Sequence, residues 1–168
     1  EETMQREFEK LGPVPFEAND ASLANEIRKT LTKDDIVASF QRIGVETPED
    51  LPLCDFVAPL DRMNSGGEGS TDVGDVSWVV PTVQARVATC AVGTPFHTWQ
   101  TVAQGKAPAA HKGMVHAAKV MAATASALIQ SPEILKAARM VHDERQVKTP
   151  YQCPIPAEVS PPVIAKQK

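Results

Sequence analysis

Apolar residues recur at helical spacing through the first third of the chain. Residues 2–11 are predicted to form a helix that ends at Gly12 and Pro13, followed by an extended segment. Asn19 or Asp20 could cap a second helix. The apolar positions of that helix repeat with a period close to 3.6 residues: Leu23, Ala24, Ile27 and Leu31.

A third helix is predicted over residues 33–43, with Thr32 as its N-cap and Gly44 just past its end. Asp34 and Asp35 lie in its first turn, where the helix dipole favours anions. Its core-facing side chains are expected to be Ile36, Phe40 and Ile43. Residues 53–60, in the proline-broken segment that follows, are apolar enough for a buried strand or a packed connector.

Residues 78–92 are rich in valine, threonine and alanine and contain no glycine. This composition is typical of a strand that is buried on both faces. Pro81 is expected at the start of the strand or at a bulge.

Two more helices are predicted in the second half of the chain. The first covers residues 113–130, and the second opens at Ser131, an N-cap followed by proline, and ends near residue 146. The buried face of the first is expected to contain Met114, Ala117, Ala118, Met121, Ala125 and Leu128, with His116, Lys119, Ser126 and Gln130 on its polar face. The second is expected to bury Ile134, Leu135, Ala138 and Val141. Residues 1–148 would then belong to one domain, and residues 149–168 would form a proline-rich extended tail.

Composition narrows the class of protein. The chain has 168 residues, 42% of them hydrophobic, which suffices for one packed core. A formal net charge of −4 gives no broad basic field, so nucleic acid is not an expected partner. No apolar run reaches the roughly 18 residues that span a membrane. Three cysteines without CxxC spacing favour core positions and a cytoplasmic location over a disulfide framework.

A glycine-rich acidic turn at residues 66–72 is the first candidate site. Ser70, Thr71 and Asp72 precede a possible short helix, so the turn could present Asp72 to a ligand. The alternative is a loop capped by an Asx or ST turn, with Asp72 or Asp75 bonded to its own backbone.

His97 is the second candidate, because it follows the predicted strand between Phe96 and Trp99. A neutral imidazole there could ligate a metal or carry a proton, or simply bond to nearby backbone. His111 and His116 are five residues apart, whereas two ligands on one helical face need a spacing of three or four. His116 is expected to face a cleft or solvent, and Lys106 and Lys112 are expected to be surface lysines.

The segments containing these candidates also carry a family resemblance. GGEGSTDVGDVSW, followed by VVPTVQARVATCAVGTPFHTWQTVAQGKAPAAHKGMVHAAKVMA, resembles the p-aminobenzoyl-glutamate hydrolase branch of the dinuclear-metal aminoacylase/carboxypeptidase amidohydrolases. MQREFEKLGPVPF, PLCDFVAPLD and YQCPIPAEVSPP extend the likeness over roughly residues 4–160.

The resemblance implies the C-terminal part of an α/β catalytic domain, in which helices flank a central mixed sheet. Two divalent cations, Mn²⁺ or Zn²⁺, and a bridging water would hydrolyse the amide bond of an N-acyl amino acid such as aminobenzoyl-glutamate. His97 matches the last metal ligand of the family. Thr71 and Asp72 would support the catalytic shell, and Gly69, Ser70 and His116 would contact substrate.

The chain departs from the family pattern in its other ligands. It has no Glu-Glu pair except Glu1-Glu2, and no His-x-Asp dyad. The remaining ligands and the general base are therefore expected in a missing N-terminal half of the catalytic domain, and the chain alone is expected to be inactive. Homo-oligomers are expected to form through a lid domain that this chain lacks. The alternative is a non-catalytic binding or assembly module that keeps the fold without a complete metal site.

Overall fold

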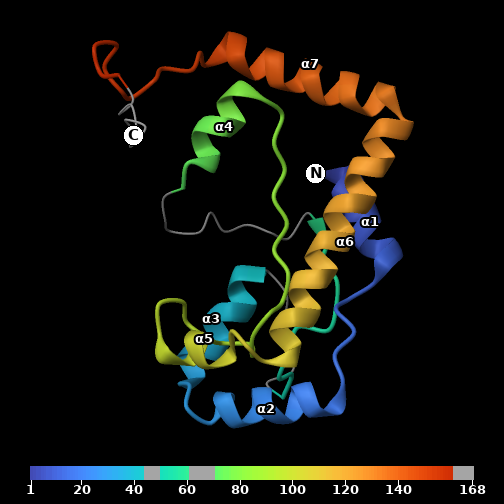
Figure 1. The fold of residues 1–168 in the computed structure, drawn as a ribbon, viewed down its shortest axis with the longest axis vertical. Helices are drawn as coiled ribbons and strands as arrows, with labels where there is room; N and C mark the ends of the chain where they lie inside the picture. The colour runs from blue at the N-terminus through green and yellow to red at the C-terminus, as the bar shows by residue number, and fades with distance from the viewer. Residues whose placement is uncertain (44–49, 61–70, 161–168) are drawn as a thin grey trace, which may run out of the picture. The chain divides into compact units, whose positions relative to one another are not determined.

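The computed structural model describes residues 1–43, 50–60 and 71–160. The chain divides into two compact units, one made of residues 1–70 and 83–132 and the other of residues 71–82 and 133–168. Within the described ranges all regular secondary structure is helical (Figure 1). The predicted α/β fold with a central mixed sheet is therefore wrong.

The first unit is built around α6 (Pro108–Gln130), which packs against α1 (Glu2–Leu11) (Figure 1). The other helices of this unit in the described ranges are α2 (Ala18–Arg28), α3 (Lys33–Ile43) and α5 (Trp99–Gln104). Its core combines α2, α6 and two irregular segments, and consists of Ala24, Ile27, Leu53, Ala91 and Ala109, with Phe16 packed against them.

The first and third helices form where the local signals predict them. α1 ends at Gly12, whose φ of 73° lies in the left-handed region that glycine tolerates. α3 begins at a reciprocal cap, because the Thr32 amide donates to the Asp35 carboxylate at 3.0 Å and the Asp35 amide donates to the Thr32 hydroxyl at 3.1 Å.

α2 begins earlier than predicted. Its N-cap is Glu17, whose amide donates to the Asp20 carboxylate at 2.8 Å. Asp20 therefore caps the helix from inside its first turn, and the prediction that Asn19 or Asp20 precedes the helix is wrong. Ala24 and Ile27 are buried as predicted, whereas Leu23 is 41% exposed.

The predicted strand at residues 78–92 does not form. α4 (Val73–Val79) takes its first two residues, and the chain then runs extended. Val83, Ala85 and Val87 are half-buried while Gln84 and Arg86 are exposed, which is the alternation of a strand. A strand also needs a neighbour for its backbone hydrogen bonds. The apolar stretch at residues 53–60 is an irregular connector and not a strand. Between residues 78–92 and the start of this connector one backbone hydrogen bond is found in the described residues, from the Val92 amide to the Pro52 carbonyl at 2.9 Å.

The buried face of α6 also differs from the prediction. The buried residues are Ala109, Gly113, His116, Val120 and Thr124, whereas Met114 is 61% exposed and Met121 is 55% exposed. Gly113 decides the face, because a Cβ atom there would lie 2.1 Å from the carbonyl oxygen of Ala88. Only glycine lets the extended segment approach α6 so closely.

The second unit contains α4 and α7 (Pro132–Lys148), and neither helix has a buried residue. The half-buried positions of α7 are spaced four residues apart at Ile134, Ala138, His142 and Gln146. Two of the predicted buried residues are exposed, Leu135 at 49% and Val141 at 60%. These predictions are wrong because the apolar pattern of α7 does not coincide with the face that packs.

Across the described ranges, every helix is too short or too polar to cross a lipid bilayer.

Candidate functional site

The loop that carries His97 is anchored from both sides. Gln104, which is only 4% exposed, accepts a hydrogen bond from the Ala91 amide at 2.7 Å and donates to the Thr94 hydroxyl at 3.1 Å. Gly93 has a φ of 95°, and a Cβ atom there would lie 2.7 Å from Ile36, so the turn needs glycine. This buried network determines the position of the chain just before the loop.

The far side of the loop is held by α5. The hydroxyls of Thr98 and Thr101 each donate to the Pro95 carbonyl at 2.7 Å. His97 therefore lies in a short loop that is pinned at Pro95 and at the start of α5.

His97 itself is exposed and has a φ of 63°, the one positive value at a non-glycine residue in the described ranges. Such backbone is uncommon outside glycine and often marks a functional position. Its imidazole makes no hydrogen bond, ion pair or ring contact within the described part of the chain. Phe96 and Trp99, the expected aromatic walls, are 69% and 59% exposed. The structure thus presents a free imidazole rather than a backbone-bonded one.

Thr71 and Asp72 lie in the other unit, at the start of α4, and both are exposed. The Val73 amide donates to the Thr71 hydroxyl at 3.4 Å, and the Asp72 side chain makes no capping bond to the helix. The Asp75 carboxylate accepts a hydrogen bond from Tyr151 at 2.9 Å. The Thr71 hydroxyl thus forms the expected ST turn and also donates to the Asp72 carboxylate at 3.4 Å, whereas neither Asp72 nor Asp75 binds its own backbone within the described residues. Gly69 and Ser70 lie outside the described residues.

His116 is buried, with 5% of its surface exposed. Its ring lies 6.4 Å from that of Phe8 between centroids, and its Nε2 atom has no partner in the described part of the chain. His116 therefore does not face solvent, because the side of α6 that carries it packs inward, but it does line an open cavity next to Lys112.

Lys112 forms an ion pair at the edge of the first unit. Its Nζ atom lies 2.5 Å from the Asp20 carboxylate and 3.1 Å from that of Glu17, and the Asp20 side chain is 2% exposed. Burial alone would raise the pKa of Asp20, but the Lys112 hydrogen bond, the Glu17 amide and the Lys112 charge together lower it. The same bond to Asp20 raises the pKa of Lys112. Lys112 is therefore a structural group and not the free surface lysine that was expected.

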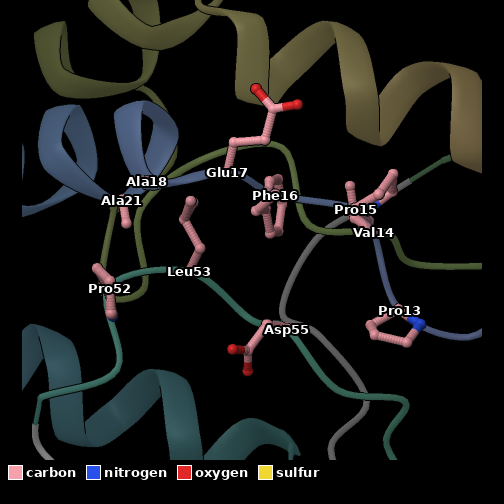
Figure 2. Close-up of a pocket in the computed structure, with 10 residues that line it drawn as sticks. All are labelled: Pro13, Val14, Pro15, Phe16, Glu17, Ala18, Ala21, Pro52, Leu53 and Asp55. Atoms are coloured by element: carbon pink, nitrogen blue, oxygen red, sulfur yellow. The ribbon is translucent and has the colours of Figure 1, made fainter.

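Two open cavities flank this ion pair. One, of about 500 Å³, lies between residues 13–21 and 52–55, where Leu53 points toward the chain at Phe16 and Glu17 (Figure 2). The other, of about 310 Å³, is lined by Pro15 and by α6 residues from His111 to Lys119. His97, Thr71 and Asp72 line neither of them.

The described residues do not form a metal centre, since no group of three or more histidine, cysteine, aspartate or glutamate side chains converges among them. Two divalent ions need at least four protein ligands. Cys54 and Cys90 are not activated as nucleophiles either, because burial raises the pKa of both thiols and so disfavours the reactive thiolate.

Comparison with known proteins gives a relative. The chain is 36% identical, over 96% of its length, to one of the subunits of p-aminobenzoyl-glutamate hydrolase from Escherichia coli strain K12. It spans 36% of the length of that protein. No family model and no solved structure matches the chain. This similarity covers nearly all of the chain, so the chain belongs to the p-aminobenzoyl-glutamate hydrolase-like family.

Proposed function

We propose that this chain is part of a metal-dependent amidohydrolase that cleaves N-acyl amino acids of the aminobenzoyl-glutamate type. The observation that carries the proposal is the likeness to a p-aminobenzoyl-glutamate hydrolase subunit over 96% of the chain. Because the chain spans only 36% of that protein, the activity belongs to a larger assembly. The relative is named as a subunit, and we propose that this chain also works with partner polypeptide, in the cytoplasm.

His97 is the residue that we propose as a metal ligand. Its imidazole is exposed and unpaired in the described part of the chain, and its loop is pinned at Pro95, so the ring is available at a defined place. A histidine held in left-handed backbone is consistent with a position kept for a ligand.

The two-cation centre itself does not fit the described residues. His97 has no acidic group, cysteine or second histidine clustered with it there. The other ligands and the general base must therefore come from outside these residues, and the chain by itself is expected to be inactive.

The remaining site residues have unequal support. Asp72 is exposed and its carboxylate does not cap α4, so the carboxylate can still reach substrate or the metal shell, although it accepts a hydrogen bond of 3.4 Å from the Thr71 hydroxyl. The Thr71 hydroxyl also accepts from the Val73 amide, so its support is weaker. A role for Gly69 and Ser70 in substrate binding stays a prediction. His116 is buried but lines the cavity next to Lys112, so its contact with substrate stays a prediction.

The decisive experiment replaces His97 in the assembled hydrolase. His97→Ala should abolish hydrolysis of aminobenzoyl-glutamate and reduce the amount of bound Mn²⁺ or Zn²⁺. The melting temperature should change little, because the ring is exposed and makes no hydrogen bond, ion pair or ring contact within the described residues. His111→Ala, which removes another exposed histidine, is the matched control and should keep activity. Normal turnover by His97→Ala would exclude His97 from the site.

A second candidate function is a non-catalytic binding or assembly module. It is favoured by the missing metal cluster in the described residues and by α7, which exposes apolar side chains without a buried face. If the assembled protein neither binds metal nor hydrolyses aminobenzoyl-glutamate, this second function replaces the first.

A further inference from the structure

Tyr151, just beyond α7, joins the end of the second unit to α4. Its hydroxyl donates to the Asp75 carboxylate at 2.9 Å, and its ring stacks on that of Trp78, with centroids 6.2 Å apart and planes inclined by 28°. Tyr151 therefore contacts both ends of α4, because Asp75 lies in the first turn of that helix and Trp78 in its last turn.

Gln146, near the end of α7, strengthens the same junction. Its Nε2 atom donates to the Trp78 carbonyl, and its Oε1 atom accepts from the Tyr151 amide at 3.4 Å. One side chain thus binds α4 and the segment that carries Tyr151 at once. Asp75, Trp78, Gln146 and Tyr151 all belong to the second unit. Because α4 and α7 have no buried residue, these polar and ring contacts are what hold the two helices together.

The contact with Asp75 can be measured through the pKa of the Tyr151 phenol. The hydrogen bond to Asp75, then burial and the nearby Cys153, raise the pKa of Tyr151 to about 12. A phenol with a raised pKa binds best while protonated, so the junction is complete below pH 10 and is lost as the pH rises through about 12.

We propose that Tyr151 is a positioning residue that fixes α4 and thereby the Thr71–Asp72 turn from which α4 starts. The Val76 amide donates to the Asp72 carbonyl at 3.2 Å, so the turn is continuous with the helix that Tyr151 holds. The effect on catalysis rests on the proposed function, in which Asp72 supports the site.

The junction can be tested on the chain alone, because Tyr151 is its sole tyrosine. Ultraviolet titration of the phenol should give a pKa near 12 in the wild type and a value closer to the ordinary 10 in Asp75→Asn, which removes the charge. A wild-type phenol that titrates near 10 would overturn the proposal.

Hydrogen exchange at neutral pH gives a second test that alkaline unfolding does not affect. Tyr151→Phe keeps the ring but loses the hydroxyl, so the Val76 and Val80 amides of α4 should exchange faster while the amides of α6 are unchanged. Gln152→Ala, at an exposed neighbour, should behave as the wild type. Unchanged exchange in Tyr151→Phe would contradict the proposal.

In the assembled hydrolase, Tyr151→Phe should lower kcat by about 10- to 100-fold with KM little changed, because a displaced catalytic group affects the reaction more than binding. A wild-type kcat in a variant whose α4 amides exchange faster would show that Tyr151 does not position the site. If the wild-type assembly does not hydrolyse aminobenzoyl-glutamate, the proposed function is wrong. The titration and the hydrogen exchange would still test whether Tyr151 fixes α4.

Discussion

At the scale of single residues, the ion pair of Asp20 and Lys112 shows what sequence reasoning misses. Asp20 was expected to cap a helix and Lys112 to face solvent, yet 92 positions separate the two partners in the chain. A local pattern reports neighbours within one or two helical turns, so it could identify Asp20 as a capping residue but not its cation. The second role of Asp20 depends on how α2 and α6 pack.

This ion pair predicts how stability depends on pH. The pKa of Asp20 is below its ordinary 3.8, so its contribution is present above pH 4 and is lost as the pH falls through the lowered value. The melting temperature of the wild type should therefore fall more steeply below pH 4 than that of Asp20→Asn. Asp34→Asn, at an exposed carboxylate, is the control and should follow the wild type. Parallel curves for the wild type and Asp20→Asn would contradict this account.

At the scale of elements, most helices were located from the sequence, but their buried faces were not. α6 begins at residue 108 rather than at the predicted 113. α1 and α3 have their predicted bounds, because capping residues and glycine act on the adjacent backbone. The hydrophobic pattern of α6 predicted the wrong face, because its many alanines make more than one face apolar enough to pack. The close approach of residue 88 to Gly113 selects the face that carries His116.

Gly113 therefore predicts a large effect from a small substitution. Gly113→Ala should destabilise the chain by about 1–3 kcal/mol or more, although alanine favours helix, because its methyl group would overlap the Ala88 carbonyl. Thermal unfolding should show a melting temperature several degrees lower. Gly105→Ala is the matched control, since its methyl group would meet its nearest neighbour at an ordinary 3.5 Å. Equal melting temperatures for the two variants would show that α6 packs on another face.

At the scale of the whole molecule, the chain spans 36% of the length of its hydrolase relative, and its described residues hold no cluster of metal ligands. A ligand that binds only the folded state must raise the melting temperature. We expect Mn²⁺ or Zn²⁺ to leave the melting temperature of the 168-residue chain unchanged and to raise that of the assembled hydrolase. A clear rise for the chain alone would mean that it holds a complete site.

The sequence by itself determined the family, through the motifs around residues 66–119, and most helices, because caps, prolines and glycines act over a few residues. It also pointed to His97, but only the structure showed the pinned loop and the left-handed backbone around that residue. The tertiary structure alone decided which side chains are buried, that residues 83–92 have no strand partner among the described residues, and that Tyr151 binds α4. These outcomes depend on contacts between residues far apart in the chain, and no local pattern of apolar and polar positions encodes them.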